Sequence, residues 1–409
     1  MGSKEKVIIV GGGHAGANVA FNLRRDGFMG DVTVLTEENH LPYHRPPLSK
    51  DFFKAKIEKE KLSLKQPSFY EENNILLQTG VRVEAIDRSN KTVEGSFGIL
   101  DYSYLVLATG ARPRVLNDAD GENTFYLRTI DDVNHISNCL SIGSKVGLIG
   151  GGYIGLELAA SLIEMEMHPV IIEAEDRLLK RVTSEEVSEF YKDFHTSKGV
   201  DIRCSTRVSE YKKLENRIFA IVLDSGDEIQ VDALIVGIGA IPNTALAEEA
   251  GLACNNGICV DAYCRSEDPF ILSAGDCTQH LNQFYQHSMR LESVPNALAQ
   301  AKVVSSSIVG GDMTYNELPW FWSDQFDLKL QMTGLSGGYD ESFIVGKKED
   351  AQFISYYGKN GSLIAVDSIN SPKEFMAIKR ALSNGFNITM ETVRDPNFKP
   401  ENLFSGSTY

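Results

Sequence analysis

Short apolar runs rich in β-branched residues recur through the first half of the chain, with more polar stretches between them. Residues 7–10, 32–35 and 104–107 are three such runs. Apart from Thr33, their residues are apolar or aromatic, which is typical of a strand covered on both faces of a parallel sheet. Predicted helices lie between these runs, so the pattern indicates an α/β unit with a doubly wound parallel sheet.

A second series of runs repeats the pattern. Residues 146–149, 170–172 and 233–236 are again continuous and apolar, which predicts a second unit of the same kind. Residues 269–276 then read as a strand that ends in Gly275-Asp276. The simplest interpretation is that the chain returns here to complete the first domain, so that the second domain is inserted into it.

The pattern changes beyond about residue 316. Residues 353–357 and 363–366 read as two strands joined by a turn at Lys359-Asn360-Gly361. Ser371-Pro372-Lys373-Glu374 predicts a capping box that opens a helix with proline at its first position, and Gly385 ends that helix. We therefore predict two Rossmann-like dinucleotide-binding domains, 1–111 with 239–315 and 112–238, and a C-terminal α+β domain, 316–409.

Each unit carries a Gly-x-Gly-x-x-Gly motif directly after its first strand. The glycines are Gly11, Gly13 and Gly16 in the first unit and Gly150, Gly152 and Gly155 in the second. The first glycine permits a tight turn, the second lets the backbone approach a pyrophosphate, and the third lets helix and strand pack closely. Glu37 and Glu173 follow at the distance expected for a carboxylate that binds a ribose. The chain is therefore predicted to hold two dinucleotides.

Composition narrows the function further. The chain has 40 basic and 56 acidic residues and a net charge of −16, which argues against nucleic acid as its main partner. Six cysteines without a Cys-x-x-Cys pair, and eight histidines without zinc spacing, favour neither a disulfide scaffold nor a metal site. Lys4, Glu5 and Lys6 lead directly into the first strand, so we expect a cytoplasmic protein that does not span a membrane.

Several longer runs accompany the glycine motifs. They are His14-Ala15 in the first motif, Pro42-Tyr43-His44-Arg45-Pro46-Pro47-Leu48-Ser49-Lys50, Leu107-Ala108-Thr109-Gly110, Gly150-Gly151-Gly152-Tyr153-Ile154-Gly155-Leu156-Glu157, Gly275-Asp276-Cys277, Glu292-Ser293-Val294-Pro295-Asn296-Ala297 and Pro319-Trp320-Phe321-Trp322-Ser323-Asp324-Gln325. With these runs, the sequence resembles the FAD-dependent ferredoxin reductases of bacterial oxygenase systems over nearly the whole chain. The Arg-Pro-Pro-Leu-Ser-Lys and Trp-Phe-Trp-Ser-Asp-Gln runs are more restrictive than the glycine motifs. His44 departs from the family, which more often has an acidic residue there.

The resemblance implies an FAD site in the first domain, an NADH site in the second, and a C-terminal domain against the flavin. It also implies that Ala15, Glu37, Lys50, Val83, Arg128, Asp276 and Val294 contact FAD and that Tyr153 and Glu157 lie near the nicotinamide. With the motif residues, the candidate cofactor-binding residues are Gly11, Gly13, His14, Ala15, Gly16, Glu37, Arg45, Lys50, Val83, Ala108, Thr109, Gly110, Arg128, Gly275, Asp276, Val294, Trp320, Gly150, Gly152, Tyr153, Ile154, Gly155, Glu157, Glu173 and Gly239.

Hydride transfer needs few side chains, because the cofactors carry the reaction. Lys50 is the candidate for stabilising charge on a reduced flavin, and Glu157 is a candidate partner for its ammonium group. With Tyr153, these residues form the predicted catalytic set. Glu173 favours NADH over NADPH, because a carboxylate accepts from a ribose hydroxyl and repels a phosphate, although Arg177 and Arg181 lie nearby in sequence.

The electron acceptor is inferred from the resemblance and from an absence. Residues 36–50 contain no cysteine, so the redox-active pair of a disulfide reductase is missing there. We expect single-electron transfer to a [2Fe-2S] ferredoxin that serves a cytochrome P450 or a Rieske oxygenase. Rubredoxin, quinone or dioxygen as acceptor, and a redox sensor of the apoptosis-inducing-factor type, remain alternatives.

The expected partner also predicts a docking surface. Ferredoxins are generally acidic, so the predicted contacts are basic residues, namely Lys302, Lys329, Lys379 and Arg380. Trp320 and Trp322 are predicted to shield the flavin or to line the electron exit, and an ordinary core role for at least one of them is the alternative. We expect a monomer or a weak homodimer.

Overall fold

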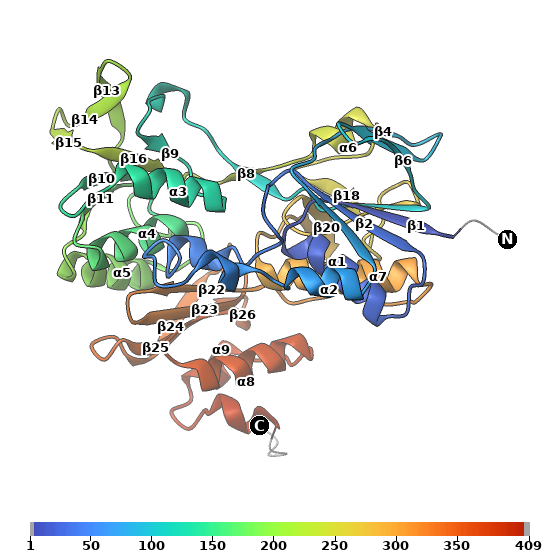
Figure 1. The fold of residues 1–409 in the computed structure, drawn as a ribbon. Coiled ribbons are helices and arrows are strands. Elements are labelled where there is room, and N and C mark those ends of the chain that lie inside the picture. The colour runs from blue at the N-terminus through green and yellow to red at the C-terminus, as the bar shows by residue number, and fades with distance from the viewer. Residues whose placement is uncertain (1–3, 405–409) are drawn as a thin grey trace. The chain divides into compact units, whose positions relative to one another are not determined.

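The computed structural model describes residues 4–404 and divides them into two compact units. The first unit comprises the residues up to His44, Lys59–Arg112 and Ala240–Pro319. The second comprises Arg45–Glu58, Pro113–Gly239 and the residues from Trp320 onward. Figure 1 shows the elements of both units in chain order. The predicted division into three domains stays a prediction.

A five-stranded parallel sheet forms the centre of the first unit, in the order β19-β7-β1-β2-β3. Val7 and Ile9 of β1 face one core, with α1 and α7, while Ile8 and Val10 face a second core, with β4, β5 and α6. Both faces are therefore buried, which explains the continuous apolar runs. The bounds are β1 (Lys6–Val10), α1 (His14–Arg25), β2 (Asp31–Thr36), α2 (Pro67–Glu72), β3 (Ile75–Thr79), β7 (Tyr104–Leu107), β19 (Ile271–Ser273) and α7 (Val294–Ile308).

Smaller elements complete this unit. An antiparallel sheet of β4 (Val83–Asp87), β5 (Thr92–Gly95) and β6 (Gly98–Asp101) precedes β7 in the chain. A second small sheet pairs β20 with β18 and β21. The remaining bounds are η2 (Lys59–Leu62), β8 (Ala111–Pro113), β17 (Ala240–Pro242), α6 (Ala245–Glu249), β18 (Ile258–Val260), β20 (Thr278–Asn282) and β21 (His287–Met289), with β8 paired to β17.

The second unit has its own parallel sheet, in the order β12-β11-β10-β16-β9. An antiparallel sheet of β13, β14 and β15 precedes β16 in the chain, as β4–β6 precede β7 in the first unit. The bounds are η1 (Pro46–Ser49), η3 (Asn117–Ala119), β9 (Thr124–Phe125), α3 (Ile130–Cys139), β10 (Lys145–Ile149), α4 (Tyr153–Glu164), β11 (His168–Ile172), α5 (Glu185–Ser197), β12 (Asp201–Arg203), β13 (Val208–Leu214), β14 (Arg217–Leu223), β15 (Glu228–Gln230) and β16 (Ala233–Val236). The predicted fold class is confirmed.

The C-terminal part of the second unit is an antiparallel sheet in the order β22-β23-β26-β25-β24, with α8 and α9 on one side (Figure 1). The predicted hairpin is confirmed, since β25 pairs with β26 and both Asn360 and Gly361 have positive φ in the turn. The bounds are β22 (Trp320–Gln325), β23 (Leu328–Gly334), β24 (Glu341–Lys347), β25 (Gln352–Lys359), β26 (Ser362–Ile369), α8 (Pro372–Ser383), α9 (Met390–Arg394) and η4 (Pro400–Phe404).

The predicted start and end of α8 are confirmed, but the capping box is wrong. Ser371 occupies the N-cap position without a side-chain cap, because its hydroxyl donates to the Ile369 carbonyl at 3.2 Å instead. Pro372 has no N–H to satisfy, which reduces the need for a cap. No helix among residues 4–404 combines the length and apolar character that crossing a membrane requires.

Candidate functional site

The turn between β1 and α1 admits only glycine at two positions. Gly11 has a φ of 113°, and a Cβ atom there would lie 2.1 Å from the Ala108 carbonyl oxygen. A Cβ atom at Gly16 would lie 1.9 Å from the Gly11 carbonyl oxygen. The turn therefore packs tightly against the end of β7 and against its own helix, as the motif requires.

Gly13 differs from these two positions because a Cβ atom there would meet nothing within 4 Å. It is the N-cap of α1 and no side chain caps the helix there, so a ligand can approach the backbone at the start of α1. Gly275, after β19, passes so close that its Cβ would lie 2.9 Å from that of Ala15. This open, uncapped helix start fits the pyrophosphate of a dinucleotide.

The turn between β10 and α4 has the same backbone. Gly150 has a φ of 107°, and its Cβ would lie 2.4 Å from the Gly237 carbonyl oxygen at the end of β16. The Cβ of Gly155 would lie 2.3 Å from the Gly150 carbonyl oxygen, whereas that of Gly152 would meet nothing within 4 Å. α4 also begins without a side-chain cap. The second unit therefore has its own turn of the dinucleotide-binding type. We call the two turns, at residues 11–16 and 150–155, the cradles of the first and second units.

The two predicted ribose-binding carboxylates lie in different surroundings. Glu173 accepts from the Gly151 N–H at 2.6 Å and from the Glu175 N–H at 2.8 Å, so its carboxylate is fixed beside the turn. Glu37 has a side chain that is 70% exposed and forms an ion pair with Arg82 at 3.1 Å. Glu173 is thus preorganised by backbone donors, whereas Glu37 is held only by an exposed cation.

Lys50 and Glu157 form a buried ion pair, with 2.8 Å between Nζ and Oε2. The Lys50 side chain is 16% exposed and that of Glu157 is 6% exposed, so both charges are largely withdrawn from water. Lys50 Nζ also donates to the Pro46 carbonyl at 3.2 Å, and the Ser49 hydroxyl donates to Glu157 Oε2 at 2.5 Å. The pairing expected from the sequence is present, and it is strengthened by hydroxyl donors that the sequence did not reveal.

α4 lies along β22 with matched spacing. Residues four apart on a helix are about 6 Å apart, close to the span of two strand residues. Tyr153 contacts Phe321, with ring centroids 4.8 Å apart, and Glu157 accepts from the Ser323 hydroxyl at 2.6 Å. Burial around its hydroxyl raises the pKa of Tyr153 well above its ordinary value, and that hydroxyl donates to Met332 Sδ at 2.8 Å. Tyr153 therefore stays neutral.

Other predicted residues fall into two groups, one in each unit. Arg45 and Arg128 are brought together, because Arg45 Nη1 donates to the Arg128 carbonyl at 2.7 Å. In the first unit, the His14 and His44 rings lie 5.7 Å apart. The first unit contains Gly11, Gly13, His14, Ala15, Gly16, Glu37, Val83, Ala108, Thr109, Gly110, Gly275, Asp276 and Val294, and the second contains Arg45, Lys50, Arg128, Gly150, Gly152, Tyr153, Ile154, Gly155, Glu157, Glu173, Gly239 and Trp320.

The predicted basic contacts are also divided between the units. Lys302 lies exposed on α7 in the first unit, whereas the other three belong to the C-terminal part of the second. Lys379 Nζ lies 3.7 Å from the Trp320 ring centroid, and Arg380 lies over Phe404. Lys329 is exposed on β23.

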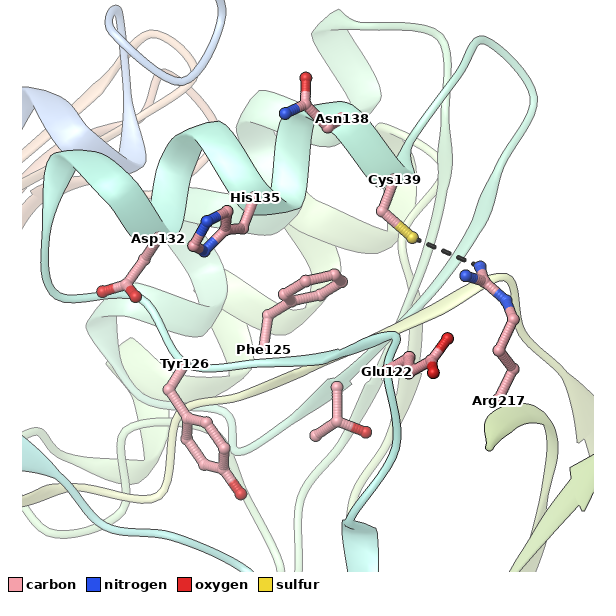
Figure 2. A pocket seen from close by; sticks show the side chains of 9 residues that line it. Glu122, Phe125, Tyr126, Asp132, His135, Asn138, Cys139 and Arg217 are labelled. Carbon is pink, nitrogen blue, oxygen red and sulfur yellow. Dashed lines mark hydrogen bonds between the residues drawn. The ribbon is translucent and has the colours of Figure 1, made fainter. Parts of the chain in front are cut away.

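A pocket in the second unit lies between α3, β9 and the start of β14 (Figure 2). Its volume is about 660 Å³, and Arg217 Nη2 donates to Cys139 Sγ at 3.6 Å on one side of it. None of the residues predicted to bind a cofactor lines this pocket. It is therefore distinct from the cradle at Gly150.

All six cysteines lie within the described residues, and each is a free thiol. Cys264 and Cys277 are buried, and burial raises the pKa of the Cys264 thiol and that of the Cys254 thiol, the latter to about 11. These thiols are therefore protonated at neutral pH and poorly suited to thiol–disulfide exchange.

Comparison with known proteins agrees with this geometry. Residues 5–301 match the pyridine nucleotide-disulphide oxidoreductase family model, and residues 320–403 match the reductase C-terminal model. The chain is 40% identical to putidaredoxin reductase of Pseudomonas putida over 392 residues, which cover 94% of this chain and 93% of that protein. It is 38% identical to a ferredoxin–NAD(P)(+) reductase of a Sphingomonas species over 407 residues, covering 98% of each.

A solved structure gives the same result. The reductase in the covalent complex of putidaredoxin reductase with putidaredoxin superposes with a TM-score of 0.95 at 38% identity, covering 98% of this chain and 99% of that chain. The expected resemblance to bacterial ferredoxin reductases is thereby confirmed. The chain belongs to the pyridine nucleotide-disulphide oxidoreductase family, which implies a flavin and a pyridine nucleotide as its cofactors.

Proposed function

We propose that this protein is an NADH-dependent ferredoxin reductase. The observation that carries the proposal is the duplicated cradle, one at the start of α1 and one at the start of α4, each with an open second glycine. Two dinucleotide sites are what an enzyme needs to pass electrons from a pyridine nucleotide to a flavin. The names of the relatives described above support a ferredoxin as the acceptor.

FAD is assigned to the first unit. The open cradle at Gly13 and the adjacent Ala15 and Gly275 would receive its pyrophosphate, because the uncapped N–H groups of α1 favour an anion. Asp276 and Val294 follow β19 and begin α7, where parallel sheets present ligand contacts. Bound FAD would accept a hydride from NADH and release electrons singly, which lets one cofactor serve a two-electron donor and a one-electron acceptor.

NADH is assigned to the second unit. Gly152 would receive the pyrophosphate, and the carboxylate of Glu173 would accept from the ribose hydroxyls of its adenosine half. Two backbone donors fix Glu173 beside the turn, and its fixed negative charge would repel the extra phosphate of NADPH. This arrangement favours NADH.

Lys50 is proposed to stabilise negative charge on the reduced flavin. Its ammonium group is largely buried and held by Glu157 and the Pro46 carbonyl, so little reorganisation is needed when charge arrives. Glu157 and Tyr153 lie on the same face of α4, which begins at the cradle, and are proposed to orient the nicotinamide. Tyr153 would do so as a neutral group.

The ferredoxin is proposed to dock on basic residues near the C-terminal sheet. Lys379 and Arg380 lie on α8 and Lys329 on β23, and Lys379 covers the Trp320 ring. An acidic ferredoxin would be attracted locally despite the net charge of −16. Lys302 on α7 is a further proposed contact.

The test is NADH-driven cytochrome c reduction with and without [2Fe-2S] ferredoxins. We expect reduction to require both the FAD-loaded protein and one ferredoxin, with NADH preferred over NADPH. Equal rates with and without every ferredoxin would instead favour another acceptor. Absence of any NADH oxidation would refute the proposed function.

A further inference from the structure

A chain of buried polar side chains leads away from Glu157 to α5. The Ser323 hydroxyl donates to Glu157 Oε1 at 2.6 Å, and Gln325 Nε2 donates to the Ser323 oxygen at 3.1 Å. Gln325 Oε1 lies 2.8 Å from His195 Nε2. All four residues are buried, and they come from α4, β22 and α5.

The hydrogen bonds of the series His195–Gln325–Ser323–Glu157 run in one direction when the His195 imidazole is the donor to Gln325. If Gln325 donates through its amide nitrogen to Ser323, its oxygen must accept from His195, so His195 carries its hydrogen on Nε2. The opposite amide orientation would turn the Ser323 hydroxyl toward Gln325 and leave Glu157 Oε1 without this donor. With His195 as the donor, all three hydrogen bonds are aligned toward the carboxylate, and aligned hydrogen bonds strengthen one another.

The surroundings of His195 keep it neutral. Its ring is fully buried and lies 5.2 Å from the Phe326 ring, with Tyr191 and Phe194 also close. Burial lowers the pKa of His195 to about 4, and among the described residues Nδ1 has no hydrogen-bond partner. A neutral imidazole with one hydrogen can donate to Gln325 and needs no counter-ion.

We propose that Ser323, Gln325 and His195 are positioning residues that fix the Glu157 carboxylate and, through it, the Lys50 ammonium group. The inference rests on the proposed function, because it assigns Lys50 to the flavin. β22 makes the arrangement possible, because Phe321, Ser323 and Gln325 alternate onto the face that meets α4. The same strand thus packs against Tyr153 and anchors Glu157.

Without this series of hydrogen bonds, Glu157 would lose the donor that holds Oε1. Ser49 and Lys50 both bind Oε2, so the carboxylate could rotate about its last bond. Lys50 would then have a less well fixed partner. A charged group displaced by a small distance loses much of its effect on catalysis, because orientation contributes strongly to rate.

The test compares Ser323→Ala with the conservative Ser323→Thr and with Ser368→Ala. Ser368 is a buried serine of the same sheet that donates to the Ser371 carbonyl at 3.0 Å and takes no part in the chain. Because hydrogen bonds to charged groups are among the stronger ones, we expect Ser323→Ala to slow flavin reduction by NADH about tenfold. Ser323→Thr retains the hydroxyl and should restore the rate to within about twofold, and Ser368→Ala should leave it unchanged.

A second measurement does not depend on activity. Lys50 and Lys54 are similarly buried, at 16% and 12% exposure, but Lys54 pairs with Glu164 and not with Glu157. Acylation of the FAD-loaded protein, followed by peptide mass spectrometry, gives the labelling ratio of Lys50 to Lys54. We expect Ser323→Ala to raise this ratio several-fold and Ser323→Thr to return it to the wild-type value.

Gln325→Glu tests the direction of the chain at nearly constant size. The new carboxylate would accept from the Ser323 hydroxyl and draw it away from Glu157, so this variant should behave like Ser323→Ala in both measurements. An unchanged labelling ratio in Ser323→Ala and Gln325→Glu, or in the latter alone if the former does not fold, would overturn the inference. If NADH does not reduce the wild-type flavin, the proposed function fails and the labelling ratio still decides the inference.

Discussion

The turn at Gly11 and the turn at Gly150 share one backbone but lead into helices with different side chains. Residues His14 and Asn18 of α1 occupy the positions that Tyr153 and Glu157 occupy in α4. Asn18 donates to the carbonyl of His14 in its own helix at 2.7 Å. Glu157 instead accepts from Ser49, Ser323 and Lys50.

The two turns share the features that suit nucleotide binding but differ in the side chains that could take part in the reaction. The second glycine leaves the backbone of each turn open, so either turn suits the pyrophosphate of a nucleotide. The second unit adds a buried carboxylate, Glu157, that is paired with the Lys50 ammonium group. The two turns therefore differ in the side chains at the first and fifth positions of the helix that follows each turn.

The largest expected effect comes from filling each cradle. Gly13 has φ −75° and Gly152 has φ −84°, so alanine fits both backbones, and its Cβ would project into the open side. We expect Gly13→Ala to weaken FAD binding about 100-fold and Gly152→Ala to raise the KM for NADH about 100-fold, because the backbone can no longer approach the pyrophosphate.

Equilibrium dialysis and steady-state kinetics measure these effects, and circular dichroism checks the fold. The assignment of the two nucleotides to the two units predicts that Gly152→Ala remains yellow. A colourless Gly152→Ala variant together with a yellow Gly13→Ala variant would reverse the assignment.

The next largest expected effect is a difference between the two units in how their stability depends on pH. Burial lowers the pKa of His280 in the first unit and of His195 in the second to about 4, and burial raises the pKa of Asp367 in the second to about 7. Between about pH 6.5 and 4 each of these histidines binds a proton in the unfolded chain but stays neutral in the native protein. The free energy of unfolding therefore falls as the pH falls. Between about pH 4 and 7 native Asp367 keeps a proton that the unfolded chain releases, so stability rises as pH falls.

The two contributions nearly cancel in the second unit. From pH 6.5 to 5 the free energy of unfolding of the first unit should fall by about 2 kcal/mol, and that of the second unit should fall much less. Hydrogen exchange of β7 and of β25, corrected for intrinsic rates, measures both. Asp367→Asn should make the second unit lose stability like the first. Equal losses in the two wild-type units would contradict this expectation.

Replacing Lys50 tests the proposed role of its positive charge in flavin reduction. Lys50→Met should leave FAD bound but slow flavin reduction by NADH at least about tenfold, because a preorganised charge is lost from a buried site. Asn18→Ala, at the α1 position equivalent to Glu157, should stay within about twofold of wild type. Stopped-flow absorbance measures both, and an unchanged rate in Lys50→Met would remove Lys50 from the mechanism.

The smallest expected effect concerns the nucleotide choice. Glu173→Gln keeps an acceptor for the Gly151 N–H but removes the charge, so the preference for NADH over NADPH in kcat/KM should fall about fivefold. Glu37→Gln, its counterpart in the first unit, should leave the preference unchanged. If the preference for NADH fell in Glu37→Gln and not in Glu173→Gln, the pyridine nucleotide would bind to the first unit and the assignment would be wrong.

Local pattern predicted much of this fold. Residues 104–107 and 233–236 coincide with β7 and β16, because strands buried on both faces are apolar at every position. The glycine turns were predictable because their geometry depends on residues a few positions apart. The capping box at Ser371 was wrong, because the hydroxyl binds the carbonyl of Ile369 instead.

The network around Glu157 could be predicted only in part. Lys50 lies in a restrictive run, and a buried lysine needs a partner, so Glu157 was a candidate partner that the ion pair confirms. Ser323 lies 166 positions from Glu157, and His195 lies 130 positions from Gln325. No local periodicity links such residues, because the contacts arise only when β22 packs against α4 and α5.

We propose that electrons enter through a pyridine nucleotide in the second unit and leave through a flavin in the first. An anaerobic titration of the FAD-loaded protein, followed by absorbance, tests this route. We predict that an equimolar amount of NADH bleaches the yellow colour and that an oxidised [2Fe-2S] ferredoxin restores it. A protein that does not retain FAD, or whose colour NADH leaves unchanged, would contradict the account.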